Sequence, residues 1–178
     1  VERGYAKFTT TRVAQRAGVS VGTLYQYFPS KEALVAALIE RKFARVQTVM
    51  AQAMAESAGQ PLEAQVRAMI SGLLEVKSAE PELGIVLAEQ LPAVDGINYK
   101  RDSSRMGLQL VETLLRANAP HLSDKSVHLC GFMCVQAVEG IISAAVTNPP
   151  IPLDDPRLLD GIVSMLMGYL RSQGATPT

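Results

Sequence analysis

The polar side chains best suited to chemistry lie between Thr9 and Lys31. The hydroxyl of Thr23 and the amide of Gln26 can hydrogen-bond with base edges or phosphates, and Val21 can contact a thymine methyl group. Lys31 stands where a helix should begin, so its charge and the helix N–H groups together suit a phosphate. These residue types predict binding to double-stranded DNA. The candidate DNA-binding residues are Thr9, Thr10, Thr11, Ser20, Val21, Gly22, Thr23, Tyr25, Gln26, Tyr27 and Lys31.

Two short helices, over residues 10–17 and 21–27, should position these groups. Thr9 or Thr10 can cap the first helix, Gly18 can adopt the left-handed conformation that ends it, and Ser20 can cap the second. The pattern predicts a helix-turn-helix whose second helix presents its N-terminal residues to a major groove. The side chains expected to face the interior are Val13, Ala14, Ala17, Val19, Leu24 and Phe28.

The charge of the chain is unevenly distributed. The net charge is zero, but residues 1–50 carry eight basic and three acidic side chains, a net charge of +5, and the remainder carries −5. A basic segment on an acidic body suggests that the segment meets a polyanion. Two alternatives stay open: the excess is modest enough to arise by chance, and the segment could be a helical hairpin that only packs, with Tyr25, Tyr27 and Phe28 in its core.

Residues 10–34, TTRVAQRAGVSVGTLYQYFPSKEAL, resemble the DNA-binding signature of the TetR family of bacterial transcriptional regulators. The strong resemblance covers about the first fifty residues; the rest is similar only in the number, order and length of its helices. It implies a homodimer with a three-helix head and a six-helix body that binds a ligand and dimerises. The family's first helix is normally longer, so a natural N-terminus is expected to precede Val1. The positions that match are Ala14, Ala17, Gly18, Val19, Leu24, Tyr25, Phe28, Ser30, Lys31, Glu32 and Leu34.

Helical periodicity recurs along the whole sequence, and strand signals are nearly absent. The fold class is therefore all-α and TetR-like, with a helix-turn-helix DNA-binding domain over residues 1–47 and a ligand-binding and dimerisation domain over 48–178. Pro61 and Pro156 are expected at first helical positions, with Asp155 as a cap. The predicted helices span residues 1–4, 10–17, 21–27, 31–57, 61–78, 81–91, 98–117, 123–147 and 155–172.

Apolar side chains of the body suggest an effector pocket and a subunit interface. Methionines suit an adaptable cavity, although plain core is the better interpretation of any single one. The candidate ligand-binding residues are Met69, Leu73, Met106, Leu110, Phe132, Met133 and Gln136. The last two predicted helices are apolar nearly all round, which requires burial on two sides and favours a four-helix dimer interface. The candidate interface residues are Ile141, Ile162, Leu166 and Tyr169.

Catalysis has no candidate residues, and no cofactor or metal is expected. Cys130 and Cys134 lie four residues apart on one helix, where buried, inert thiols are the simplest interpretation. His121 and His128 are poorly placed to complete a metal site with them. No uninterrupted run of 18 apolar residues occurs and no signal peptide is recognisable, so we expect a cytoplasmic protein that does not cross a membrane.

The sequence thus predicts a homodimeric transcriptional repressor that binds a palindromic operator and is released by a small apolar or amphipathic effector. Two alternatives remain: a dimeric DNA-binding regulator without an effector, and a helical small-molecule-binding protein or enzyme that does not use DNA.

Overall fold

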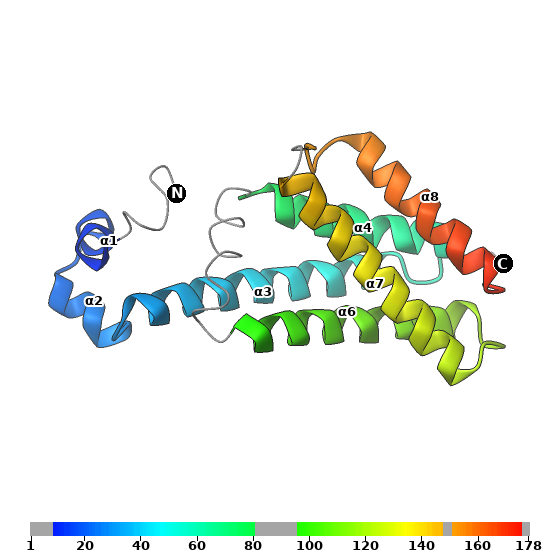
Figure 1. Cartoon of the computed structure of the whole chain (residues 1–178), viewed down its shortest axis with the longest axis horizontal. Coiled ribbons are helices and arrows are strands. Elements are labelled where there is room, and N and C mark those ends of the chain that lie inside the picture. Colours follow the sequence, from blue (N-terminus) through cyan, green and yellow to red (C-terminus); the bar gives the residue numbers. More distant parts are fainter. Residues whose placement is uncertain (1–8, 81–95, 148–150, 176–178) are drawn as a thin grey trace.

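The computed structural model describes residues 9–80, 96–147 and 151–175, and this part of the chain is helical without strands. The all-α prediction is therefore confirmed. The helices expected over residues 1–4 and 81–91 lie outside the described residues. In the described ranges the helices are α1 (Thr10–Ala17), α2 (Val21–Tyr27), α3 (Lys31–Glu56), α4 (Leu62–Ser78), α6 (Gly96–Asn118), α7 (Asp124–Thr147) and α8 (Pro156–Ser172), labelled as in Figure 1.

The helices begin where local capping groups start them. Each of four capping residues accepts a hydrogen bond from a backbone N–H in the first turn that follows. These caps are Thr9, Ser20, Ser30 and Asp155. Pro156 is the first residue of α8, as expected. Pro61 immediately precedes α4, which begins at Leu62, so the prediction for Pro61 was wrong by one position.

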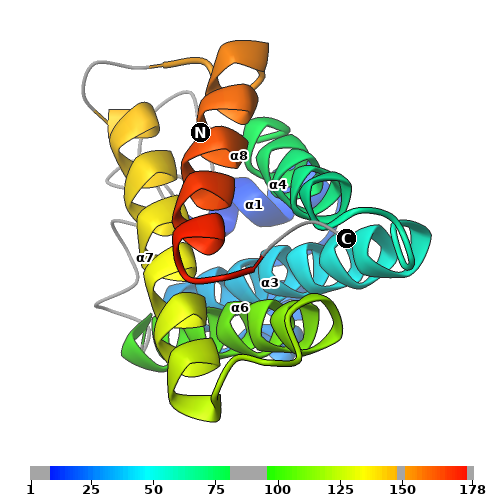
Figure 2. The ribbon, with the colours of Figure 1, turned by 90° about the vertical axis from the view of Figure 1, so that its right-hand side faces the viewer.

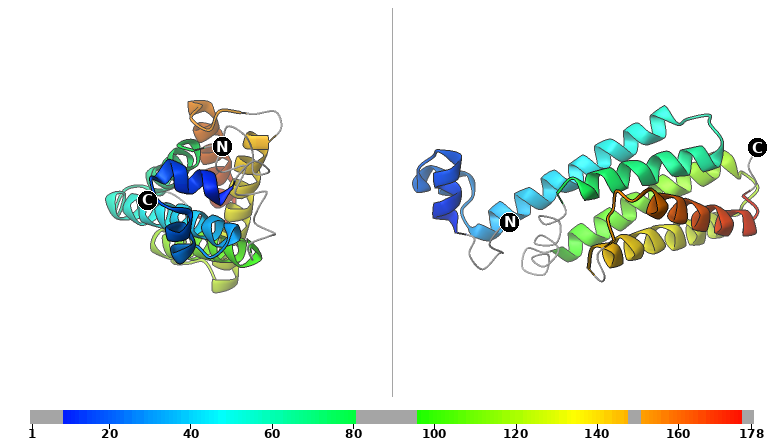
Figure 3. Two further views of the ribbon diagram at one scale, coloured as in Figure 1. Left: turned by 90° about the vertical axis from the view of Figure 1, so that its left-hand side faces the viewer. Right: turned by 90° about the horizontal axis from the view of Figure 1, so that it is seen from above.

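Helix α3 joins a small head to a larger body. Helices α1 and α2 pack at its N-terminal end, and the remaining helices lie along its other part (Figures 1 and 3). The head core is a separate cluster of Ala14, Leu24 and Leu34, with Val13, Val21 and Phe28 packed against it. Because α3 contributes Leu34 to the head and Met50 to the body core, one rigid helix connects the two regions.

Helices pair closely within the body. A Cβ added at Gly72 of α4 would lie 2.8 Å from Val49 Cγ1 of α3, and one at Gly131 of α7 would lie 2.7 Å from Leu108 Cδ1 of α6. Side chains at these two glycines would therefore push the helix pairs apart. Figure 2 shows α8 between α4 and α7. The α4–α8 contact carries two ion pairs, Arg67–Asp160 at 2.7 Å and Arg171–Glu63 at 2.8 Å.

Helix α7 is unusually apolar. An 18-residue stretch within Asp124–Val146 has a mean hydropathy of 1.8 and would pass for a membrane span by length and composition, but a core helix of a soluble protein passes the same test. Only 33% of that stretch is buried within the protomer. Much of this apolar helix is therefore left on the surface of a single chain.

Candidate nucleic-acid interface

The turn between α1 and α2 is formed by local interactions. Gly18 has φ 70°, a left-handed conformation that suits glycine, and its N–H donates to the carbonyl oxygens of Ala14 and Gln15. Two residues later, Ser20 Oγ accepts from Thr23 N at 2.9 Å and starts α2. The predicted helix-turn-helix is thus present, with α2 as the second helix.

The outer surface of α2 is polar and aromatic. Tyr27 is 76% exposed and Tyr25 is 45% exposed, so the alternative in which both tyrosines fill a hairpin core is wrong. The hydroxyl of Tyr25 lies 3.1 Å from Thr10 Oγ1, which ties α2 to the start of α1. No sequence pattern predicts this link, since the two residues are fifteen positions apart.

Thr23 and Gln26 differ in how free their polar groups are. Thr23 Oγ1 lies 2.8 Å from Ser20 Oγ, so part of its hydrogen-bonding capacity is used inside the helix cap. Gln26 is exposed and makes no hydrogen bond to another residue in the described part of the chain. Gln26 is therefore the better placed of the two to contact a base.

All eleven predicted DNA-binding residues lie at the surface of the head or at its edge. Eight are exposed, while Thr10, Val21 and Lys31 are half-buried. Val21 also packs against the head core, which limits what it can offer to DNA. The exposed residues are Thr9, Thr11, Ser20, Gly22, Thr23, Tyr25, Gln26 and Tyr27.

Two interior positions in the head were predicted wrongly. Val19 is 41% exposed and Ala17 is also exposed. The left-handed turn at Gly18 leaves both on the outside, and Val13, Val21 and Phe28 pack against the core instead.

The start of α3 is electrostatically suited to a phosphate. Ser30 Oγ accepts from Ala33 N at 3.1 Å, and Lys31 is the first residue of the helix. The backbone N–H of Glu32 and the Ser30 hydroxyl hold the pKa of the Glu32 carboxyl below its usual value. These N–H groups therefore already stabilise negative charge at this helix end.

The predicted effector residues differ in their burial within the protomer, and their assignment to a pocket stays a prediction. Met69 is 5% exposed within the body core, and Leu73 and Leu110 pack against that core. Phe132 is 50% exposed, Met133 is 47% exposed, and Gln136 is exposed as well, because α7 turns this face away from the core. Met106 is half-buried on α6.

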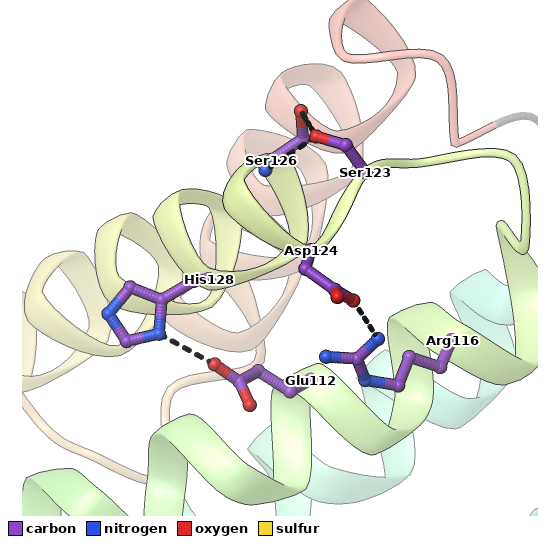
Figure 4. Close-up of polar contacts among 6 residues, drawn as sticks. All are labelled: Glu112, Arg116, Ser123, Asp124, Ser126 and His128. Carbon is purple, nitrogen blue, oxygen red and sulfur yellow. Dashed lines mark hydrogen bonds and ion pairs between the residues drawn. The ribbon is translucent and has the colours of Figure 1, made fainter.

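A shallow depression of about 660 Å³ lies where the start of α7 crosses α6. In Figure 4, His128 Nδ1 lies 2.8 Å from Glu112 Oε1, and Arg116 pairs with Asp124. Ser123 caps α7 beside them, accepting from Ser126 N. These polar contacts fasten α7 to α6, and Phe132 forms part of the apolar rim.

The predicted interface residues are mostly covered within one protomer. Ile162 is 2% exposed and Leu166 is 5% exposed, both in the body core. Ile141 and Tyr169 are half-buried against the same core. A partner could therefore add little burial to Ile162 or Leu166. The apolar side chains that do face outward on α7 and α8 are Leu129, Phe132, Met133 and Met165.

The cysteines are buried free thiols. Cys130 is 1% exposed and Cys134 is 4% exposed. Burial raises the pKa of Cys134 to about 12, and Cys130 contributes in the same direction. The thiol therefore stays protonated at neutral pH, a poor state for a nucleophile or metal ligand. No group of three His, Cys, Asp or Glu side chains that could hold a metal occurs among the described residues.

A helix-turn-helix on a helical body defines the class of DNA-binding transcriptional regulators. Residues 1–38 match the family of bacterial regulatory proteins named tetR, and residues 61–170 match the tetracyclin repressor-like C-terminal domain. The chain belongs to the TetR family, and its N-terminal domain is a DNA-binding domain.

Individual relatives agree with this assignment. The chain is 35% identical over 86 residues to the nucleoid occlusion factor SlmA of Glaesserella parasuis, covering 48% of this chain and 41% of that protein. It is 47% identical over 45 residues to the transcriptional repressor KstR of Rhodococcus jostii, covering 25% of this chain and 21% of KstR. The matches thus span less than half the length of these curated relatives.

Solved structures show the same fold. A TetR transcription regulator from Haloarcula marismortui has a TM-score of 0.72 at 20% identity, covering 96% of this chain and 89% of the other. A TetR-like regulator from Rhodococcus sp. RHA1 has a TM-score of 0.68 at 24% identity, covering 96% and 88%. The predicted TetR-like fold and family are confirmed.

Proposed function

We propose that the protein represses transcription as a homodimer that binds a palindromic operator through two copies of α2. The observation that carries this proposal is the outer surface of α2, where Tyr25, Gln26 and Tyr27 are exposed on a basic head. A two-fold dimer presents two such helices to successive major grooves, and this geometry requires a palindromic site. The relative KstR is named a transcriptional repressor, which supports repression rather than activation.

The outward apolar face of α7 and α8 supports the dimer. Leu129, Phe132 and Met133 are 47–55% exposed on α7, and Met165 is 41% exposed on α8. A Cβ added at Gly140, Gly161 or Gly168 would meet nothing within 4 Å inside the protomer. Burial of this apolar face against a second copy of the chain is favourable, and glycines on the face allow helices of the two copies to approach closely.

Regulation by a small apolar or amphipathic effector is the second part of the proposal. An effector that favours one arrangement of the two heads by about 1–3 kcal/mol would change operator occupancy several-fold or more. The alternative is a DNA-bound protein without an effector.

DNA selection tests the first part. We expect this protein to enrich near-palindromic duplexes from a random pool and to lose affinity steeply with salt. Gln26→Ala should relax preference at particular bases by about 1–3 kcal/mol, whereas Lys31→Ala should weaken all duplexes alike and reduce the salt slope by about 1.

Lys125→Ala is the matched control, because Lys125 also stands in the first turn of a helix but lies on the body. It should leave DNA binding unchanged. Enrichment of no sequence, together with indifference to Lys31→Ala, would overturn the assignment of α2 and the start of α3 to DNA.

A further inference from the structure

A second cavity, of about 240 Å³, lies between the middle of α3 and the C-terminal end of α4. Figures 1 and 3 show these two segments side by side, away from α1 and α2. Leu38 and Val76 supply apolar lining from the two helices. The polar lining is Arg41, Lys42, Arg45 and Glu80.

Among the described residues that line it, the cavity has more positive than negative charge. Lys42 Nζ donates to the backbone carbonyl oxygen of Glu80 at 3.4 Å, a long contact. Arg41 and Arg45 make no hydrogen bond or ion pair with any residue in the described ranges. Within the described part of the cavity lining, Glu80 is the one acidic side chain, against three cations.

Neighbouring charge increases the imbalance. Burial and the nearby Lys77 both lower the pKa of Lys42, and burial lowers the pKa of Lys77. The carboxylate of Glu139 has the opposite effect and raises the pKa of Lys77. That carboxylate already accepts hydrogen bonds from Ser104 Oγ, at 3.2 Å for Oε1 and 3.1 Å for Oε2. An anion bound beside partly buried, neighbouring cations stabilises their charged form.

Contact with the DNA backbone is a poorer explanation of these cations. Arg41 follows Lys31 by ten residues, a distance of about 15 Å along the helix axis. The facing wall is formed by Val76 and Glu80 at the end of α4, which belongs to the body. A cleft closed by a body helix suits a small molecule better than a duplex.

We propose that this cavity binds a small organic anion, namely a carboxylate or phosphate attached to a short apolar group. The cations of α3 would bind the charged end, while Leu38 and Val76 would contact the apolar end. The volume lies below the range of about 300–1,000 Å³ for drug-sized ligands, so the occupant is small. The anion would link α3, which carries the head, to α4. This regulatory consequence rests on the proposed DNA-binding function, whereas anion binding itself does not.

Titration calorimetry on the whole chain tests the site without DNA. The probes are hexanoate and phenyl phosphate, with 1-hexanol as the neutral match. We expect saturable binding of at least one anion, one per protomer, and no binding of 1-hexanol. Equal binding of hexanoate and 1-hexanol, or no binding of either anion, would overturn the proposal.

Two variants locate the binding. Lys42→Gln and Arg45→Gln should each weaken anion binding at least tenfold, while Lys125→Gln, on the far side of the body, should not change it. Each cavity variant removes a repelled charge, so circular dichroism should show an unchanged or raised Tm. Anion binding that survives both cavity variants would place the site elsewhere and refute the assignment.

A parallel DNA-binding measurement distinguishes the anion site from the proposed DNA-binding function, on which the regulatory role of the site rests. Anion binding without any DNA enrichment would refute the proposed function but leave the site. Intact DNA binding without anion binding would refute the site alone. If Lys42→Gln and Arg45→Gln weaken DNA as much as Lys31→Ala does, and no anion binds, the cations belong to the DNA contact surface.

Discussion

The head and the body of this protein use apolar side chains in opposite ways. In the described part of the head, Ala14, Leu24 and Leu34 form a small core cluster, and caps and a glycine turn set its shape. The body has a core that runs through α3, α4, α6, α7 and α8, and it still leaves an apolar face outside. The head is therefore suited to present polar groups, and the body is suited to join other surfaces.

The largest expected effect on folding and assembly comes from placing a charge in the core of the body or on its exposed apolar face. Ile162→Glu puts a carboxylate where 2% of the side chain is exposed, and we expect a loss of about 4–5 kcal/mol or more, enough to prevent folding. Phe132→Glu changes a half-exposed side chain and should leave a folded monomer. Circular dichroism and light scattering distinguish the two outcomes. A folded Phe132→Glu dimer would place the subunit contact elsewhere.

These two faces also show where sequence reasoning reached its limit. On α7, the buried positions Val127, Cys130, Cys134 and Val138 follow helical spacing, but Leu129, Phe132 and Met133 on the other side are equally apolar. A helix that is apolar all round gives no indication of which side is the protomer core. Periodicity therefore could not separate the candidate pocket and interface residues of α7 and α8 from the protomer core, and those assignments stay predictions.

The head was more predictable because its signals are local. Gly18, Ser20 and Ser30 act on backbone groups within a few residues, so their roles follow from type and position alone. Tertiary contacts such as Tyr25 with Thr10, or the basic cavity between α3 and α4, join residues far apart in sequence. No periodicity or capping rule predicts such pairings.

Shortening one leucine in each core compares the two regions directly. Leu115 is 0% exposed and Leu24 is 7% exposed, and truncation of such leucines to alanine costs about 2–5 kcal/mol. We expect Leu115→Ala to lower the melting temperature of the whole protein. Leu24→Ala should loosen the small head and abolish DNA binding while the body stays folded. Hydrogen exchange measures the protection of backbone amides in the head and in the body separately. Equal loss of protection in both regions for either variant would mean that they unfold as one unit.

Two glycines, one in the head and one in the body, allow a comparison in which the expected loss of stability is smaller. Gly18 in the head and Gly59 between α3 and α4 have φ 70° and 77°, and an added Cβ would meet nothing within 4 Å at either. Alanine should therefore cost only backbone strain, about 1–2 kcal/mol, at both sites. Thermal melting should show similar losses. Only Gly18→Ala should also weaken DNA binding, because Gly18 sets the angle between α1 and α2.

The smallest expected effect is a pH dependence at two helix starts, Glu32 in the head and Asp155 in the body. Hydrogen bonds from Arg157 lower the pKa of Asp155, and backbone and Ser30 hydrogen bonds lower the pKa of Glu32. A carboxyl whose folded pKa is depressed stabilises the fold above its unfolded pKa, about 4, and loses that contribution as the pH falls through the folded value. Asp155→Asn and Glu32→Gln should each flatten the fall in Tm between neutral pH and about pH 3, where the carboxyls protonate. If the two regions melt separately, Asp155→Asn should affect only the body transition and Glu32→Gln only the head transition. A change in both transitions from either variant would show that α3 couples the two regions more tightly than their separate cores indicate.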